Sequence, residues 1–188
     1  MAKKSDLVKY VHQYLGHELR SVSAEAARLV QSTLSVEEQT LIYKYSEDGY
    51  DEVNTALRNS LGRDFSPLAK FLESTLDKLP DYKGLVHRSA NLTQAKLDKY
   101  VQAFNNSAIL VEHSFVSTSK SYATANMFGG NCRFNIISKS GKEIEVYAKY
   151  GAASGQNEYE VLFKPNCKFD ILEITKTNGD TLIIMEEV

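Results

Sequence analysis

The sequence predicts an α+β protein in which helices precede strands along the chain. Residues 1 to about 80 carry apolar side chains at steps of three and four, the period of a helix with one buried face. From residue 83 to the end, runs rich in Val, Ile, Phe and Tyr alternate with turn signals such as Ser-Gly, Pro-Asn and Asn-Gly. No internal repeat, low-complexity tract or linker interrupts either part. We therefore expect residues 1–188 to form a single domain.

The helical part contains recognisable start and stop signals. Helical spacing occurs at Leu7, Val11, Tyr14 and Leu15, and again at Ala26, Leu29, Val30 and Leu34. Ser35 and Glu38 form the pattern of a capping box at the start of a helix. The pairs Asp48-Gly49 and Leu61-Gly62 predict breaks between helices, and Pro67 suits the first turn of the next one.

The second part is predicted to be mainly strand. A short apolar strand at 84–87 leads into a helix that carries Leu97, Tyr100, Val101 and Phe104. Six further strand-like runs follow, at 109–117, 132–138, 143–150, 158–163, 168–175 and 181–186.

Composition and charge narrow the class of protein. The 22 Lys and Arg against 24 Asp and Glu give a formal net charge of −2, which argues against a nucleic-acid binder with a strongly basic surface but leaves a local basic groove possible. No run approaches the roughly 18 apolar residues of a membrane span, and the N-terminus is too polar for a secretory signal. Cys132 and Cys167 form no disulfide framework, so we expect a reducing compartment and a chain that is cytoplasmic as synthesised.

Several catalytic motifs are missing from the sequence. It contains no G-x-G-x-x-G, Walker loop, H-E-x-x-H or G-x-S-x-G pattern. The four histidines, at 12, 17, 87 and 113, lack metal-ligand spacing with the cysteines. A metalloenzyme, a P-loop NTPase and an α/β-hydrolase are therefore disfavoured, and we expect no metal.

Three polar elements stand out against apolar strands. Arg88 ends the strand at 84–87, Ser117-Thr-Ser119 follows another apolar run, and Glu158-x-Glu160 begins a third. Each has an ordinary explanation: a solvated strand end, a helix cap, and two carboxylates on one exposed face of a strand. Considered together, in this order on three strands, they are more specific.

This set resembles the Arg/Ser-Thr-Ser/Glu-x-Glu signature of mono-ADP-ribosyltransferases of the bacterial toxin or exoenzyme type, including the clostridial actin- and Rho-modifying enzymes. The likeness extends over roughly Leu34 to Glu186. It departs at His87, where an aromatic residue is common, and at Ser89, where Gly often follows the arginine. The resemblance implies N-terminal helices packed on a split, strongly bent mixed β-sandwich that holds NAD as co-substrate.

The resemblance also implies roles for the catalytic residues. Arg88 would bind NAD through its fork of donors, and Glu160 would stabilise the positive charge that develops on the ribose. Ser117 would hold Glu160, and Thr118 and Ser119 would start a helix or pack. Glu158 would activate an acceptor arginine, although Gln156-x-Glu158 gives a second possible register.

Two further NAD contacts follow by analogy. Arg58 matches an arginine that binds NAD phosphate, with a surface helix charge as the alternative. The loop from Phe128 through Gly129 to Arg133 occupies the place of the phosphate–nicotinamide loop, with a plain turn as the alternative. Tyr147, Tyr150 and Tyr159 lie near the expected acceptor loop, where they could contact a protein partner or belong to the core.

The first functional hypothesis is therefore an NAD:protein-arginine ADP-ribosyltransferase. NAD hydrolysis with water as acceptor, or a catalytically silent interaction module, are the alternatives. Actin, a small GTPase or a bacterial protein are all compatible as targets for a monomeric enzyme, with no membrane partner and nucleic acid disfavoured. Secretion or injection into a target cell would need a route outside this chain.

Overall fold

The computed structural model describes residues 4–25, 32–177 and 179–188. Its helical half contains α1 (Lys4–Tyr14), α2 (Gly16–Ala24), α4 (Val36–Lys44), the π-helical turn η1 (Tyr45–Gly49), α5 (Tyr50–Asn59) and α6 (Pro67–Leu76). The remainder contains β1 (Asp81–Ala90), α7 (Gln94–Asn105), β2 (Leu110–Glu112), β3 (Val116–Ser119), α8 (Tyr122–Met127), β4 (Cys132–Glu143), β5 (Glu160–Phe163), β6 (Cys167–Thr177) and β7 (Asp180–Glu187). Helices thus precede strands, as predicted.

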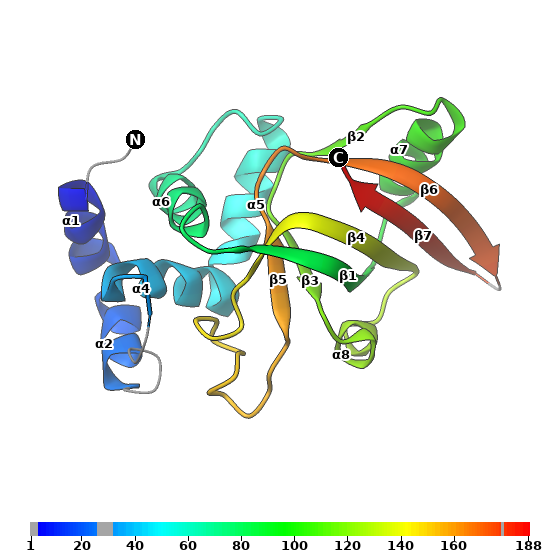
Figure 1. The fold of residues 1–188 in the computed structure, drawn as a ribbon. Helices are drawn as coiled ribbons and strands as arrows, with labels where there is room; N and C mark the ends of the chain where they lie inside the picture. Colours follow the sequence, from blue (N-terminus) through cyan, green and yellow to red (C-terminus); the bar gives the residue numbers. More distant parts are fainter. Residues whose placement is uncertain (1–3, 26–31, 178) are drawn as a thin grey trace.

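Local signals start the helices where the sequence placed them. The Ser35 amide donates to Glu38 Oε2 at 2.9 Å and the Glu38 amide donates to Ser35 Oγ at 3.4 Å, which confirms the capping box. Pro67 is the first residue of α6 and Ser66 caps it. The predicted boundary at 48–49 is present, since η1 ends at Gly49 and α5 begins at Tyr50, but the backbone hydrogen bonding is not broken there: the Tyr50 amide donates to the Tyr45 carbonyl. Figure 1 shows α5 turned away from the axis of α4.

The described strands form one mixed sheet in the order β1-β3-β5-β4-β7-β6-β2. Only β4 and β7 are parallel. β1 also pairs with β4 from Asp81 to Ala90, so the first four strands close into a ring. β3 and β5 run across the direction of β1 and β4 in Figure 1, which confirms the strongly bent mixed sheet.

Two apolar clusters stabilise this arrangement. The first lies mainly among the helices and includes Leu41, Leu57, Leu72 and, from the strand half, Phe115 and Leu162. The second lies between the sheet and α7. It includes Val86, Phe134, Val161, Phe163, Phe169 and Ile183. Leu162 belongs to the first cluster and Val161 to the second, so β5 lies between the two clusters.

Three expected elements differ from the structure. The run at 109–117 is divided into β2 and β3. The predicted strand at 143–150 is wrong: β4 ends at Glu143, and the amides of Tyr147 and Ala148 donate to the Ile144 carbonyl in a single helical turn. Ile144 and Ala148, four residues apart, are both buried, which is helical rather than strand spacing. Of the helical run at 26–34, Ala26, Leu29 and Val30 lie outside the described residues, and Leu34 is buried but not helical.

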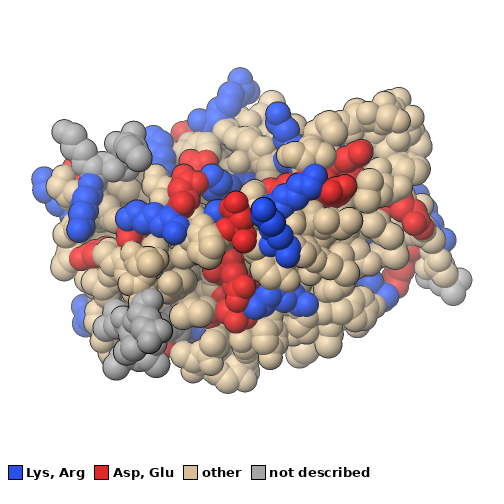
Figure 2. Space-filling view, viewed as in Figure 1, with Lys and Arg blue, Asp and Glu red and all other residues tan. Residues whose placement is uncertain are grey.

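Charges of both signs are mixed over the face in Figure 2, in keeping with the near-zero net charge. Among the described residues, no helix is long and apolar enough to cross a membrane.

Candidate active site

A cavity of about 1010 Å³ opens where the helices meet the bent part of the sheet. Its walls come from η1 and α5, the end of β1, α7, β2 and β3, and the segment that enters β5. Of the predicted site residues, six line it: Arg58, Arg88, Ser117, Phe128, Glu158 and Glu160. The cavity therefore brings together side chains from five separate stretches of the chain.

Arg88 is held by the strand that carries it. Val86 is fully buried on β1, and Arg88 follows two residues later on the same side of the strand. Its Nη1 donates to the Ser117 carbonyl oxygen at 2.6 Å, which joins β1 to β3 just before the pairing of His87 with Ser119. The backbone thus fixes one edge of the guanidinium and leaves its other donors for a ligand.

Ser117 and Glu160 face one another across β3 and β5. Ser119 pairs with Glu160 and Ser117 with Leu162, so these side chains share one side of the sheet. Thr118 points to the other side, where its hydroxyl donates to the Val161 carbonyl at 2.7 Å. Thr118 therefore packs, as expected, whereas the helix cap of α8 is Ser121.

Glu160 is the most perturbed acid of the cavity. Its side chain is only 5% exposed. Burial raises its pKa to about 7, and nearby Glu158 adds to the rise, while a hydrogen bond from Ser117 and the charge of Arg88 oppose it. A carboxylate in this state can stabilise positive charge in a largely dry site.

Glu158 lines the same cavity, but from the segment before β5, whereas the sequence predicted it on the strand itself. β5 begins only at Glu160, so the two acids do not lie on one strand. Tyr159 between them has φ +51°, a left-handed conformation that is unusual for a tyrosine. The Asn157 side chain accepts from the Tyr159 amide at 2.8 Å, and the Ser119 hydroxyl donates to the Glu158 carbonyl at 2.6 Å. Glu158 is half-buried, and burial raises its pKa.

Two predicted NAD contacts lie at the edge of the cavity. Arg58 Nη1 donates to Ser114 Oγ at 3.4 Å and Nη2 to Thr55 Oγ1 at 3.3 Å. Phe128 follows α8 and is 62% exposed. Gly129, with φ +62°, follows Phe128 outside the cavity lining.

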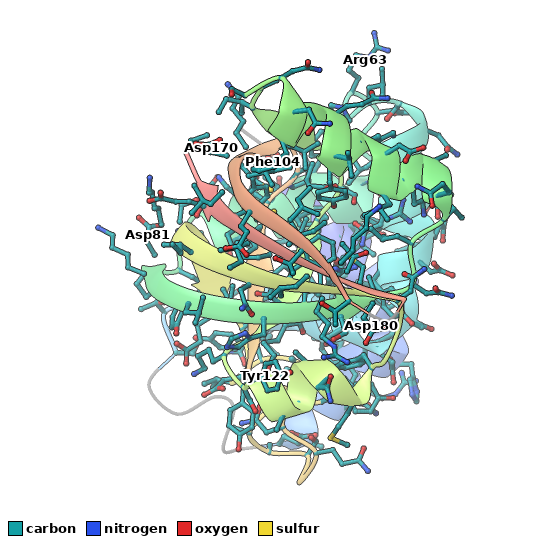
Figure 3. The ribbon with its side chains drawn as sticks, turned by 90° about the vertical axis from the view of Figure 1, so that its right-hand side faces the viewer. Arg63, Asp81, Phe104, Tyr122, Asp170 and Asp180 are labelled. Atoms are coloured by element: carbon teal, nitrogen blue, oxygen red, sulfur yellow. The ribbon has the colours of Figure 1, made fainter. Side chains whose placement is uncertain are left out.

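Arg133 does not reach the cavity. Its Nη2 lies 3.0 Å from Asp180 Oδ2, and Asp180 sits at the far end of the β6–β7 hairpin in Figure 3. The reason is the register: Arg133 pairs with Ser89 on one side and Leu182 on the other, which directs it toward that hairpin. The prediction that Arg133 contacts the cofactor therefore lacks geometric support.

The sequence assigned no role to Tyr45 and Asn54, which complete the inner wall. The Asn54 amide nitrogen donates to the Tyr45 hydroxyl at 3.0 Å, and its oxygen accepts from the Phe115 amide at 3.0 Å. Tyr45 is fully buried, and burial together with the charge of Glu160 raises its pKa. Its hydroxyl also bonds to Ser117. Both residues lie in the segment on which the resemblance rests, but only the fold brings them together.

No three His, Cys, Asp or Glu side chains gather as a metal site within residues 4–25, 32–177 and 179–188. The groups that line the cavity include guanidinium groups, hydroxyls and the two carboxylates of Glu158 and Glu160.

Comparison with known proteins agrees with this geometry. The family model described as ADP-ribosyltransferase exoenzyme matches residues 20–188. Tre1 of Serratia proteamaculans (strain 568), an NAD(+)--protein-arginine ADP-ribosyltransferase, is 30% identical over 175 residues, 88% of this chain and 35% of its own length. Mav of Mycobacterium avium (strain 104), provisionally named an NAD(+)--arginine ADP-ribosyltransferase, is 30% identical over 177 residues, 91% of this chain. This chain spans 20% of Mav, so it covers only a minor part of either relative.

Solved structures share the fold. Exoenzyme S of Pseudomonas aeruginosa, in complex with human 14-3-3 protein beta and bound to carba-NAD, has a TM-score of 0.76 at 17% identity, over 98% of this chain and 88% of that one. Vis of Vibrio splendidus, in complex with agmatine, has a TM-score of 0.65 at 23% identity, over 100% and 87%.

Proposed function

Since the chain belongs to the ADP-ribosyltransferase exoenzyme family, we propose that it transfers ADP-ribose from NAD⁺ to an arginine side chain of a target protein and releases nicotinamide. The names of the curated relatives support arginine as the acceptor. The observation that carries the proposal is the pair of carboxylates in one cavity, Glu160 deeply buried and Glu158 half-buried. Glu160 suits the cleavage of NAD⁺, and Glu158 suits activation of the acceptor arginine.

The cavity suits NAD⁺ as a substrate in size and charge. Its volume is at the upper end of the range for small-molecule sites. Neither Arg58 nor Arg88 has an ion-pair partner among the described residues, so both guanidinium groups can bind the pyrophosphate. Phe128 and Gly129 would border the nicotinamide end, where an exposed ring and a residue without a side chain allow close approach. The carba-NAD bound to exoenzyme S supports a dinucleotide in this fold.

Cleavage breaks the bond between the nicotinamide nitrogen and C1′ of the ribose. The bonding electron pair leaves with nicotinamide, and positive charge develops on the ribose as in glycoside hydrolysis. Ionised Glu160 stabilises this charge, and Ser117 with Tyr45 keeps its carboxylate in place. Arg88 anchors the phosphate side while its Nη1 stays on the Ser117 carbonyl.

Transfer forms a bond between a guanidinium nitrogen of the acceptor and C1′. A guanidinium is protonated in water and is a poor nucleophile. Glu158 orients it and accepts the proton that it loses as the bond forms, so the sum is ADP-ribosyl-arginine, nicotinamide and one proton. The raised pKa of Glu158 favours this acceptance.

We extend the proposal to the organisation of the enzyme. Residues 1–188 act as one catalytic domain, because residues of the strand half, Phe115, Ile144 and Leu162, pack into the helical cluster. The partner is a target protein with an accessible arginine, such as actin, a small GTPase or a bacterial protein, met in the cytoplasm of a target cell.

The test is transfer of labelled ADP-ribose from NAD⁺ to eukaryotic and bacterial lysates, with free nicotinamide measured in parallel. Wild type should label a discrete protein, and Glu160→Ala should abolish both labelling and nicotinamide release. Glu158→Ala should abolish labelling and spare release, because only the acceptor step needs it. Release without labelling by wild type would favour NAD hydrolysis, and no release at all would leave a binding module.

A further inference from the structure

Glu158 belongs to the long connection between β4 and β5, and backbone hydrogen bonds within this connection join its two sides. The Ala152 amide donates to the Glu145 carbonyl at 2.9 Å, and the Glu158 amide donates to the Tyr150 carbonyl at 2.9 Å. Gly151 lies between the residues that form these two hydrogen bonds, and a Cβ at this position would come 1.8 Å from the Glu145 carbonyl oxygen. The position of Glu158 therefore depends on where the segment around Tyr150 is held.

Lys149 ties that segment to the helical half. Its amide donates to Ser46 Oγ at 2.8 Å, and its Nζ donates to the Tyr43 hydroxyl at 2.6 Å. The same Nζ lies 3.2 Å from Glu47 Oε1 and 5.0 Å from the centre of the Tyr43 ring. The main chain and side chain of Lys149 thus bind three residues of the α4–η1 junction, Tyr43, Ser46 and Glu47.

That junction is itself part of the active site. The π turn places Tyr45 inward, fully buried and close to Glu160, while Ser46 and Glu47 face the β4–β5 connection. Ser46 is fixed in turn, since its hydroxyl donates to the carbonyls of Ile42 and Tyr43 at 3.0 and 3.1 Å. The η1 turn therefore places Tyr45 close to Glu160 on one side and binds the β4–β5 connection, which contains Glu158, on the other.

We propose that Lys149 is a positioning residue for the acceptor step. It fixes the β4–β5 connection on the α4–η1 junction so that the Glu158 carboxylate faces the incoming guanidinium. Glu160 is held separately: it begins β5, and its carbonyl accepts from the Ile144 amide at 3.0 Å. Loss of the Lys149 contacts should therefore impair transfer more than cleavage of NAD⁺. The inference rests on the proposed function, in which Glu158 receives the acceptor proton.

The test compares two rates in the same enzyme sample. Nicotinamide release without an acceptor reports cleavage, and formation of ADP-ribosyl-agmatine, with agmatine as a guanidine probe, reports transfer. Lys149→Met keeps the aliphatic stem and removes the charge and its hydrogen bonds. It should lower transfer about ten- to a hundredfold while release stays within about twofold, since small misplacements have effects of this size. Lys149→Arg, which keeps a cation beside Glu47 and Tyr43, should recover much of the transfer.

Lys164→Met is the matched control, because Lys164 is similarly exposed and pairs with Asp77 beyond the other end of β5. It should leave the ratio of transfer to release unchanged. Ser46→Ala removes the acceptor of the Lys149 amide together with the hydroxyl's own bonds to the Ile42 and Tyr43 carbonyls, and leaves the Lys149 side chain unchanged. It should lower the ratio in the same direction and covers the case in which Lys149→Met fails to fold. An unchanged ratio in both Lys149→Met and Ser46→Ala, or an equal fall of both rates, would overturn the positioning role. A wild-type enzyme without either activity would refute the proposed function itself, and that result appears before any substitution is made.

Discussion

Replacement of Glu160 by Gln should stabilise the protein at high pH and not at low pH. The pKa of the buried carboxyl is raised from its ordinary 4.5 to about 7. At about 1.36 kcal/mol per pKa unit, that difference of 7 − 4.5 = 2.5 corresponds to roughly 3 kcal/mol. The folded state disfavours the charged form of Glu160. Its contribution to the free energy of unfolding is therefore fully present below pH 4.5 and is lost as pH rises through 7. Glutamine does not titrate, so the variant escapes this loss.

The measurement is the free energy of unfolding of both proteins at about pH 5 and about pH 8, by urea or thermal denaturation. The variant minus wild-type difference should grow by about 2–3 kcal/mol between the two conditions, which is a change of about 5–10 °C in the difference between melting temperatures. Comparing differences cancels any constant effect of the amide on packing. A difference that stays flat from pH 5 to pH 8 would show that Glu160 is not buried in the way the structure indicates, and would remove the physical basis for its catalytic role.

Four further outcomes are expected. The kcat/KM of the wild type for NAD⁺ should rise with pH through a midpoint near 7 as Glu160 ionises. Ser117→Ala should move that midpoint upward, since it removes a hydrogen bond to the ionised form; a downward move would contradict this. Arg133→Ala should leave the KM for NAD⁺ within about twofold, because an exposed ion pair holds that side chain outside the cavity. A large rise in KM would return Arg133 to the NAD site. Gly130→Ala should cost about 2 kcal/mol or more in urea unfolding, because φ is +115° and a Cβ would lie 2.4 Å from the β1 backbone. Gly129→Ala, with nothing within 4 Å of its Cβ, should cost only about 1 kcal/mol, and equal losses would contradict the distinction.

Features that depend on neighbouring residues were predictable from the sequence. The capping box of Ser35 and Glu38 and the first-turn position of Pro67 follow from hydrogen bonds and φ angles within one turn of helix. The helical and strand halves follow from the change in hydrophobic period. The grouping of Arg88, Ser117 and Glu160 depends on which strands pair, so it could be expected only from resemblance to a family.

Features that depend on an irregular backbone were not predictable. Tyr45 and Asn54 are nine positions apart, which in a regular α-helix is about two and a half turns and puts them on opposite faces. Their hydrogen bond requires the π turn at η1, and no residue pattern in that segment announces it. Likewise, the run at 143–150 alternates like a strand, yet the burial of Ile144 and Ala148 against the helical cluster favours a helical turn.

The positive φ of Tyr159 allows Glu158 and Glu160 to have different surroundings, which a regular strand would not allow. The proposed mechanism needs Glu160 shielded from water and Glu158 open to a bulky guanidinium. On a continuous strand, residues two apart share one face and meet similar surroundings. Breaking the strand at Tyr159 lets β5 bury Glu160 between two apolar clusters while the hydroxyl of Ser119 and the carbonyl of Tyr150 hold the backbone of Glu158 at the rim. The strained tyrosine is thus the local reason that two acids, two positions apart, can carry out different steps. It also leaves Glu158 outside β5, in the connection that the contacts of Lys149 position.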